Sequence, residues 1–389
     1  MRALTLLTCL CGTAAGAQQW VQLPDFPGSA RDDAASFTIY EKTFVGTGLD
    51  LNFQLTDDWY VFDTYTEVWD TIAVLPASPR QYCTAFALDD KGYLFGGLDA
   101  NGPLNELWCY DPGADSWSAK ASLPTAGRYA SSVIIGGGHA FICTGMLAGN
   151  VPTNEVWRYD PVNDLWEQKA AVPGPPRHRA MSDDFLLAGG ADSLFQALTD
   201  CYEYAYVTDT WIAKADLPEG RYAADMVDGI LIGGASSPTQ VHDQVWWYDW
   251  LGDAWGTTSF PPFMGGPRRG GTTGRNLVIA DIGVIYFGLG SDNVQRYKDW
   301  WRLDFAVGID AHRSCVLLLR PMPAANALFI TYSDQAPHVL ELVDLAGRTV
   351  HTWNGRPERI DVSELAPGRY SLLDRTNGGR RATPVMIAR

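Results

Sequence analysis

Short runs rich in aromatic and β-branched residues alternate with clusters of Gly, Pro, Asn and Asp along most of this chain. In the best-preserved stretch the runs occupy residues 82–88, 93–95, 106–111 and 116–117. An Asp-Asp-Lys-Gly segment separates the first two runs, and Pro-Gly-Ala-Asp separates the last two. Short runs bounded by such residues are typical of β-strands joined by turns. The pattern therefore predicts an antiparallel unit of four strands.

This unit recurs along the chain, and a tryptophan marks the fourth strand of each copy at intervals of 44 to 49 residues. The phased tryptophans are Trp20, Trp69, Trp117, Trp166, Trp211 and Trp255. A pair of glycines ends the second run of several copies, as in Gly96-Gly97 and Gly189-Gly190. An aromatic pair followed by Asp recurs on the third run. Self-similarity at this period is typical of propeller arrays.

These four features resemble the kelch repeat over roughly residues 18 to 306. The resemblance implies an all-β fold, with a six-bladed kelch β-propeller followed by a small C-terminal β-sandwich. Paired glycines suit positions near a propeller axis, where backbones approach closely. We expect the phased tryptophans to pack between neighbouring blades and to serve the scaffold.

The two ends of the repeat array are incomplete in complementary ways. The chain opens on Trp20 with no strands before it, and Asp310 stands where the last copy would carry a tryptophan. We therefore expect residues 20–24 to supply the missing strand of the last blade. This pairing would close the ring and remove its open sheet edges.

The chain termini differ in composition from the repeats. Residues 1–17 have a charged start, a short apolar run and an Ala-Gly-Ala end, as in a secretory signal peptide. No other stretch is long and apolar enough to cross a bilayer. After Asp310 the lysines disappear and short strand-like runs continue, which predicts a small β-sandwich. We expect a signal peptide at 1–17, a propeller at 18–310 and a C-terminal domain at 311–389.

The C-terminal part resembles the sorting domain of the type IX secretion system of Bacteroidetes-type bacteria. The matching segments are residues 321–324, 343–348 and 360–370, of which the last is the most specific. The family usually has Asn where Met322 stands, and it usually ends on a Lys-rich strand. The resemblance implies that type IX machinery exports the protein to the cell surface or beyond. An accessory β-sandwich that remains attached is the alternative.

Charge divides along the same boundary. Residues 18–310 carry 18 basic and 38 acidic side chains, whereas residues 311–389 carry ten Arg and seven acids. Such an acidic propeller repels a phosphate backbone, so we expect no nucleic-acid partner. We expect a monomer that stays soluble outside the cell. Five cysteines beyond the signal peptide lack paired spacing, which favours buried thiols over a disulfide framework.

No catalytic constellation is visible in the repeats. The propeller contains three histidines, His139, His178 and His242, each in a different repeat. The copper oxidases of this fold need two Tyr, two His and a Cys together, so we expect no metal and no cofactor. Six-bladed kelch sialic acid mutarotases share the architecture, but no acid–base pair or long insertion marks that activity here. Ser-His-Asp catalysis lacks its elbow motif. We therefore assign no catalytic residue.

An arginine precedes the first strand of each repeat and is followed closely by aromatic or basic residues. The candidate ligand-binding residues are Arg31, Arg80, Arg128, Arg177, Arg221 and Arg269 (Arg268 being the other choice in the last repeat), with Tyr82, Tyr129 and Tyr222. A ring of guanidinium groups can bind carboxylates and tyrosines can stack on sugars. The alternative is that each arginine pairs with an acid of an adjacent blade, such as Glu106 or Glu155.

The sequence thus predicts an exported kelch propeller that binds a glycan or a protein without catalysis. A carbohydrate-active enzyme that works in the propeller channel, as a mutarotase, oxidase or hydrolase, is the alternative. A third possibility is a structural surface protein.

Overall fold

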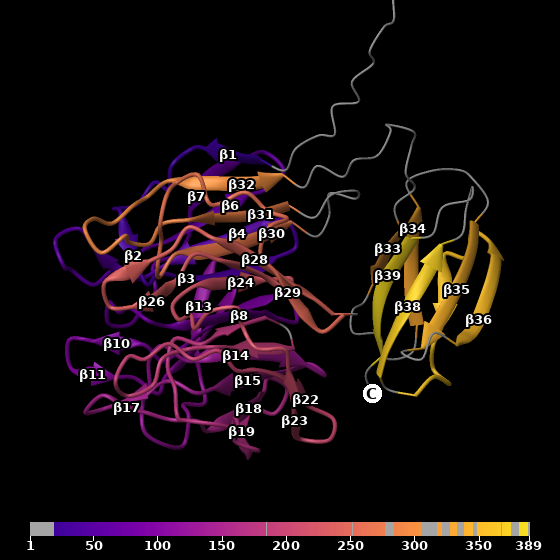
Figure 1. The fold of residues 1–389 in the computed structure, drawn as a ribbon, viewed down its shortest axis with the longest axis horizontal. Helices are drawn as coiled ribbons and strands as arrows, with labels where there is room; N and C mark the ends of the chain where they lie inside the picture. The colour runs from indigo at the N-terminus through magenta and orange to yellow at the C-terminus, as the bar shows by residue number, and fades with distance from the viewer. Residues whose placement is uncertain are drawn as a thin grey trace, which may run out of the picture.

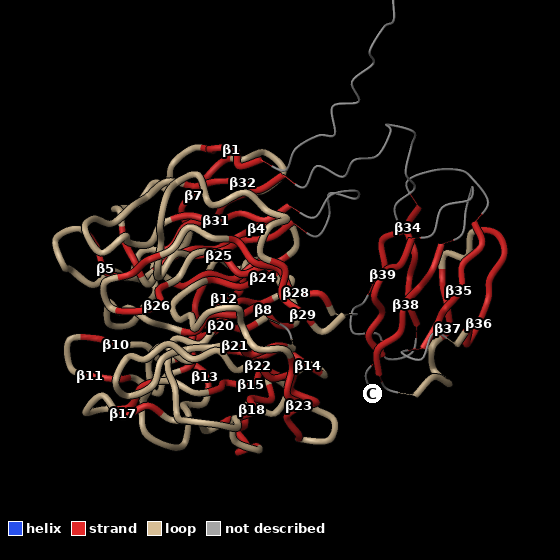
Figure 2. The backbone as a smooth tube through the Cα atoms, in the orientation of Figure 1, coloured by secondary structure: helices blue, strands red, loops and turns tan. Residues whose placement is uncertain are grey.

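The computed structural model describes residues 19–183, 185–250, 252–276, 284–304, 317–320, 327–332, 338–344, 348–366, 368–374 and 381–387. Over these residues the chain forms β-strands and turns and no helix (Figure 2). Accordingly, a search of the same residues for a helix long and apolar enough to cross a membrane finds none. The expected signal peptide lies outside this part of the chain.

Six four-stranded antiparallel sheets occupy the described residues between 19 and 304 (Figure 1). The first sheet contains β3 (Ala35–Ile39), β4 (Lys42–Gly46), β6 (Trp59–Asp63) and β7 (Val68–Thr71). The second contains β8 (Thr84–Leu88), β9 (Lys91–Phe95), β12 (Leu107–Asp111) and β13 (Ser116–Lys120). The third contains β14 (Ser132–Gly136), β15 (His139–Cys143), β18 (Val156–Asp160) and β19 (Leu165–Lys169).

The remaining three sheets repeat this order. The fourth contains β20 (Met181–Ser182), β21 (Leu186–Ala188), β22 (Cys201–Ala205) and β23 (Thr210–Lys214). The fifth contains β24 (Asp225–Val227), β25 (Ile230–Ile232), β28 (Val245–Asp249) and β29 (Ala254–Gly256). The sixth contains β30 (Thr272–Asn276), β31 (Val284–Gly288), β32 (Trp300–Asp304) and β1 (Gln19–Leu23). Each sheet is one copy of the sequence repeat, and the repeats are numbered accordingly below.

Small two-stranded sheets extend several repeats, and all of them except the first are hairpins. They pair β2 (Arg31–Asp32) with β5 (Leu49–Asp50), β10 (Leu98–Asp99) with β11 (Gly102–Pro103), β16 (Met146–Leu147) with β17 (Val151–Pro152), and β26 (Ala235–Ser237) with β27 (Gln240–Val241). Apart from the first pair, these hairpins connect the second strand of a sheet to its third strand.

The six first strands neighbour one another in a closed order. β3 contacts β8 and β30, and β14, β20 and β24 complete the circle between them. β3, β8 and β14 alternate buried and half-buried residues, as expected of strands whose side chains point in turn to opposite faces. The second strands are buried almost throughout, as in β31. Hydrophobic packing between successive sheets therefore surrounds a ring of first strands.

Strand β1 closes this ring as the sequence predicts. Its five residues pair antiparallel with β32, from Gln19 opposite Asp304 to Leu23 opposite Trp300. Trp20 is buried and packs edge-to-face on Phe263 at 4.9 Å between ring centroids. Chain segments from the two ends of the repeat array thus share one sheet.

The phased tryptophans join neighbouring sheets, and this prediction is confirmed. Each indole Nε1–H donates a hydrogen bond to a backbone carbonyl of the preceding repeat. The donor and acceptor pairs are Trp20 and Pro261, Trp69 and Pro24, Trp117 and Ala73, Trp166 and Ala121, Trp211 and Ala170, and Trp255 and Ala215. The large indole ring packs at the contact between two sheets, and its single N–H group forms a hydrogen bond across the same contact.

The paired glycines lie where the backbone of the next repeat comes close. A Cβ placed on Gly96 would lie 2.5 Å from the carbonyl oxygen of Arg128, and one on Gly189 would lie 2.4 Å from that of Arg221. Both glycines have a positive φ, near +59° and +56°. Both steric room and backbone conformation therefore require glycine here.

The C-terminal residues form two further antiparallel sheets, drawn in yellow in Figure 1. One contains β33 (Leu317–Arg320), β34 (Ala327–Tyr332) and β37 (Arg359–Asp361), and the other contains β36 (Thr349–Gly355), β35 (His338–Asp344), β38 (Gly368–Asp374) and β39 (Arg381–Ile387). Leu328 and Ile330 of the first sheet share one buried cluster with Leu340, Leu342 and Leu372 of the second. Apolar residues of both sheets thus build a single core.

Candidate ligand-binding site

The phased arginines are among the most completely buried side chains of the described residues. Arg31, Arg80, Arg128, Arg177, Arg221 and Arg268 are each between 0% and 1% exposed. A buried guanidinium needs an ionic partner and many hydrogen-bond acceptors. Five of the six obtain the partner from an acid that precedes the third strand. These pairs are Arg31 with Asp58 (2.6 Å), Arg80 with Glu106 (2.9 Å), Arg128 with Glu155 (2.7 Å), Arg177 with Asp200 (2.6 Å) and Arg268 with Asp299 (2.9 Å).

The alternative interpretation named Glu106 and Glu155 correctly but placed them in an adjacent blade. Both acids belong to the same sheet as the arginine that they bind. Several of these arginines also donate to the carbonyl of the residue that follows the second strand, as Arg177 does to Gly189 at 3.0 Å and Arg221 to Gly233 at 2.8 Å. The phased arginine therefore ties three segments of its own repeat together.

The fifth repeat departs from this pattern. Gln244 stands where the other repeats carry an acid, and its Oε1 accepts from Arg221 Nη2 at 2.8 Å. The only carboxylate near Arg221 is that of Glu219, at 3.2 Å, among the described residues. Burial lowers the pKa of Arg221 to about 10, against the opposing effect of Glu219. Arg221 therefore lacks the acid before the third strand that pairs with the other five phased arginines.

In the sixth repeat the phased position is held by Arg268, the other residue that the sequence offered there. Arg268 occupies the phased position and pairs with Asp299, whereas Arg269 lies one residue further on and is 23% exposed. Its Nη1 lies 3.6 Å from Asp32 Oδ2 and 3.9 Å from Asp33 Oδ2. Arg269 therefore belongs to a different group of side chains from the five arginines predicted with it.

The second residue after each phased arginine forms a closed ring of backbone hydrogen bonds. Its members are Asp33, Tyr82, Ala130, Arg179, Ala223 and Gly270. Each N–H donates to the carbonyl of the member in the preceding repeat, at 2.8 to 3.2 Å, and Asp33 donates to Gly270 to close the ring. All six have φ between +52° and +58°. Three polar or charged side chains, those of Asp33, Tyr82 and Arg179, project from this left-handed backbone.

An ion pair crosses the centre of this ring. Arg179 of the fourth repeat donates from Nη1 to Oδ1 of Asp33 of the first repeat at 3.3 Å. The first and fourth members of a six-membered ring lie opposite one another. The pair therefore spans the ring from side to side.

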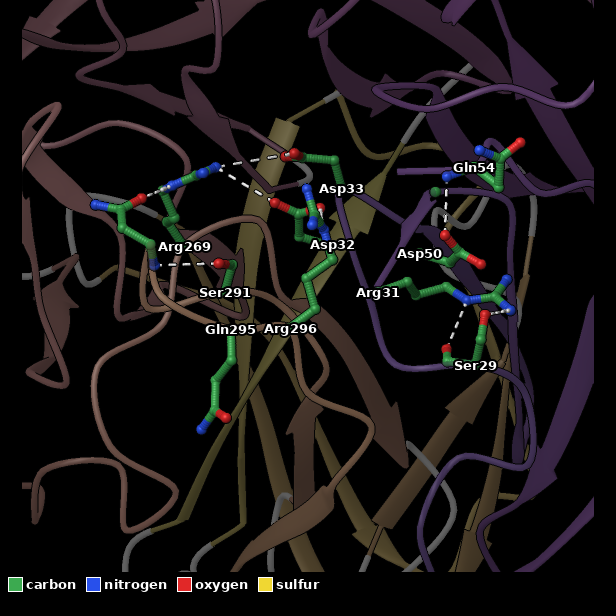
Figure 3. A network of polar contacts seen from close by, with 12 residues as sticks. Ser29, Arg31, Asp32, Asp33, Asp50, Gln54, Arg269, Ser291, Gln295 and Arg296 are labelled. Atoms are coloured by element: carbon green, nitrogen blue, oxygen red, sulfur yellow. Dashed lines mark hydrogen bonds and ion pairs between the residues drawn. The ribbon is translucent and has the colours of Figure 1, made fainter. Parts of the chain in front are cut away.

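Two further arginines complete what we call the central cluster: Asp32, Asp33, Arg179, Arg269 and Arg296. Arg296 donates from Nε to Asp32 Oδ1 at 2.5 Å. Figure 3 shows Arg269 reaching toward both carboxylates, while the side chain of Arg31 points away from them toward Ser29. Asp32 and Asp33 are almost fully buried, whereas the side chains of Arg179 and Arg296 are 12% and 13% exposed.

The three arginines of the central cluster use few of their donors. Each guanidinium carries five N–H groups. To other described residues, Arg179 donates one hydrogen bond to Asp33, Arg296 one to Asp32, and Arg269 one to Asn293 Oδ1. The phased arginines donate between one hydrogen bond, at Arg128, and six, at Arg31, but their remaining donors are buried. The side chains of Arg179, Arg269 and Arg296 are instead 12%, 23% and 13% exposed. The central cluster thus retains donors that a ligand can occupy.

The predicted tyrosines lie beside this cluster. The guanidinium of Arg179 stacks over the ring of Tyr82 at 4.5 Å, and the Tyr82 and Tyr129 rings are 5.7 Å apart. Tyr129 is half-buried and its hydroxyl donates to Asn150 Oδ1 at 3.1 Å. Burial raises the pKa of Tyr222, and the charges of Arg179 and Arg269 oppose that rise. Tyr82, Tyr129 and Tyr222 are therefore grouped with Arg179 rather than with the phased arginines.

The pKa of the Asp33 carboxyl lies above the usual range of an aspartate. Burial raises the pKa of Asp33 to about 6, Asp32 adds to the rise, and Arg179 and Arg269 oppose it. Burial in contrast lowers the pKa of His178, in the neighbouring position of the fourth repeat, to about 4. Near neutral pH the cluster therefore holds a titratable carboxyl and a neutral histidine at its border.

Sequence reasoning missed Asp32, Asp33 and Arg296. The first two occupy the same phase as Gln81-Tyr82 and Tyr222-Ala223, so their position after Arg31 was a usable signal. Arg296 lies in the loop before β32 and has no counterpart in the repeat pattern. Only the three-dimensional arrangement brings it to Asp32.

The described residues show no metal centre and no disulfide. They contain no group of three or more His, Cys, Asp and Glu side chains that could hold a metal ion. Cys83, Cys109, Cys143 and Cys201 are free thiols, and Cys315 lies outside the described residues. A hollow of about 410 Å³ lies between the turns around Glu41, Asp90 and Pro112, and none of the predicted binding residues lines it.

Comparison with known proteins agrees with both resemblances seen in the sequence. Residues 15–182 match the KLHDC2/KLHL20/DRC7 Kelch-repeats domain, and residues 319–387 match the secretion system C-terminal sorting domain. A solved structure titled "Structure of YjhT" is similar with a TM-score of 0.58 and 15% identity, over 80% of this chain and 99% of that chain. At this identity the likeness shows the fold alone. Comparison with curated proteins finds no match. The chain thus contains a kelch-repeat domain over residues 15–182 and a type IX C-terminal sorting domain over residues 319–387, and the sorting domain indicates export to or beyond the cell surface.

Proposed function

We propose that this exported protein is a six-bladed propeller that binds a carboxylate-bearing glycan or protein at its central cluster, without catalysis. The under-used donors of Arg179, Arg269 and Arg296 carry the proposal. Three guanidinium groups face two carboxylates, which leaves one positive charge for a ligand. This site replaces the ring of phased arginines, which are at most 1% exposed and already face a carboxylate of their own repeats.

The chemistry of the site suits an acidic sugar or a chain with an exposed carboxylate. Guanidinium groups bind carboxylates through two parallel hydrogen bonds, and partial burial strengthens such bonds. Tyr82 and Tyr129 offer ring faces on which a sugar can stack. The site needs no cofactor or metal for this role.

The proposal extends to the organisation of the chain. We assign residues 1–17 to a signal peptide, 18–310 to a closed propeller and 311–389 to a β-sandwich that the type IX export machinery recognises. The closed first-strand circle and the shared core of the two C-terminal sheets support these assignments. We assign a monomer, because β1 covers the edge of β32 within the same chain.

Saturation-transfer NMR of the full chain with a panel of neutral and acidic saccharides tests the binding role. We expect acidic sugars to receive saturation, and Arg179→Gln to weaken binding at least about tenfold, because it removes a charged donor from a partly buried site. Arg158→Gln is the matched control, since Arg158 on β18 pairs with Glu167 on β19, away from the cluster. Equal binding by all three proteins, with equal melting temperatures, would show that the ligand binds elsewhere.

A carbohydrate-active enzyme is the second candidate, and one observation favours it. Asp33 has a pKa of about 6 and lies beside Tyr82 and Arg179, so it can exchange protons near neutral pH. The same NMR samples distinguish the two functions. Anomeric signals that appear or exchange faster with protein than without it, and that revert to the uncatalysed rate in Asp33→Asn, would establish the enzyme.

A further inference from the structure

The carboxyl of Asp33 occupies the middle of the central cluster and competes with any ligand for its donors. Arg179 of the fourth repeat lies 3.3 Å from Asp33 Oδ1, and Arg269 of the sixth repeat lies 3.9 Å from Oδ2. The groups that face Asp33 from other elements are these two arginines, Tyr82 of the second repeat and the neighbouring Asp32. Arg296 is engaged with Asp32. Asp33 is thus the internal carboxylate that a ligand carboxylate would most directly replace.

The charge count depends on one proton. With Asp32 and Asp33 both ionised, three arginines leave the cluster with one positive charge. A proton on Asp33 raises this to two and removes the ionic partner of Arg179. The neutral carboxyl can then donate a hydrogen bond, whereas the carboxylate only accepts.

We propose that the central cluster takes up a proton on Asp33 as it binds a carboxylate, so that the site holds a monoanionic ligand more tightly in mildly acidic than in neutral solution. This inference rests on the proposed binding function and adds its regulation. At higher pH Asp33 loses its proton and pairs with Arg179 again, so the bound anion is released.

The sign of the effect follows from proton linkage. Free Asp33 already titrates near pH 6, with burial as the main cause. A bound anion adds negative charge beside it and raises its pKa further. The bound state therefore holds more protons than the free state above pH 6, and affinity falls as pH rises through this window. A sugar carboxylate remains ionised down to about pH 5, so the ligand itself does not reverse the trend.

Isothermal titration calorimetry of the full chain with D-glucuronate tests the proposal, with D-glucose as the uncharged control. We expect binding about tenfold tighter at pH 5.5 than at pH 7.5, which corresponds to a shift of about one pKa unit. At pH 6.5 the heat should differ between bis-tris and imidazole buffers, because protons are taken up from the buffer. Asp33→Asn should bind D-glucuronate at pH 7.5 nearly as tightly as the unsubstituted protein does at pH 5.5, with little pH dependence.

A second, half-buried carboxyl supplies the control. Burial raises the pKa of Asp225 on β24 to about 7, but its hydrogen-bonding partner is Thr273 rather than the cluster. Asp225→Asn should therefore keep the pH dependence of the unsubstituted protein. Binding that is equally tight at both pH values, with no buffer-dependent heat, would overturn the proton linkage and leave the binding site standing. Failure of D-glucuronate to bind at either pH would overturn both proposals. The buffer comparison on the unsubstituted protein decides the matter even if Asp33→Asn does not fold.

Discussion

At the residue scale, two arginines separated by one residue in the fourth repeat, Arg177 and Arg179, have different surroundings. Arg177 donates two hydrogen bonds to Asp200 and others to backbone carbonyls, so its charge and donors are satisfied internally. Arg179, two residues later, donates a single hydrogen bond to Asp33. The left-handed backbone at Arg179 turns its side chain toward the ring, and this difference in direction separates scaffold from site.

The fifth repeat offers a test of whether the ion pair of the phased arginine stabilises the fold, because Arg221 lacks that pair. Gln244→Glu gives Arg221 the carboxylate that the other repeats provide, and we expect it to stabilise the fold by about 0.5–1 kcal/mol. The nearby Glu219, 46% exposed, limits the gain through like-charge repulsion. The converse substitution in the second repeat, Glu106→Gln, should destabilise it by about 1 kcal/mol because Arg80 is 1% exposed. Urea unfolding midpoints measure both. A destabilising Gln244→Glu together with a neutral Glu106→Gln would refute the ionic role of the phased arginine.

Much of the candidate site was visible in the sequence at this scale, but its geometry was not. The phase of the repeat places Tyr82, Tyr129 and Tyr222 near the ring, and the structure groups them beside Arg179. The repeat pattern could not reveal that Arg80 and Arg128 turn away from these tyrosines and bind acids of their own repeats. The direction of each side chain depends on the backbone, because a residue with a positive φ, such as Arg179, points its side chain differently from one with an extended backbone. Arg296 comes from a loop outside the repeat pattern, so no periodicity marks it.

At the scale of elements, the strand order follows from complementary ends of the repeat array. The last repeat lacks its fourth strand and the chain begins with a surplus one, which predicts one pairing, and β1 makes it with β32. The hairpins β10–β11 and β16–β17 were not predicted, because two-residue strands give too short a hydrophobic pattern to recognise. Periodicity thus determines the large sheets, whereas the small hairpins depend on local turn geometry.

Closure by β1 predicts a large effect from a single side chain near the start of the fold. Trp20→Ala removes the contact with Phe263 and the hydrogen bond to the carbonyl of Pro261. Substitution of a buried tryptophan by alanine costs about 3–5 kcal/mol, so we expect a strongly lowered melting temperature. Gln22→Ala, at an exposed position of the same strand, should change the free energy of unfolding by no more than about 0.5 kcal/mol.

Deletion of residues 19–24 should in addition expose the edge of β32 and cause aggregation, which size-exclusion chromatography would detect. Normal melting of Trp20→Ala would mean that the strand does not hold the ring closed.

At the scale of the whole molecule, a small positive cluster lies within a strongly acidic protein. The full chain carries a formal net charge of −16, whereas the central cluster has one positive charge when both aspartates are ionised. An anionic ligand is therefore repelled at long range and attracted only at short range. Salt screens interactions between exposed charges more than those between partly buried ones, with a Debye length of about 30 Å at 0.01 M and about 8 Å at 0.15 M.

This separation of scales predicts an unusual salt dependence. For an acidic oligosaccharide, the association rate constant should rise as ionic strength increases from 0.01 to 0.15 M, because the repulsion from the acidic surface is screened first. For D-glucuronate, with a single charge, the rise should be smaller, and a neutral saccharide should show none. The dissociation rate constant should change little, since it reflects the hydrogen bonds of Arg179, Arg269 and Arg296 inside the cluster. Stopped-flow or surface plasmon resonance measurements across this salt range separate the two rate constants. An association rate that falls with salt would mean that exposed basic side chains steer the ligand, and the binding site would then have to be sought away from the ring.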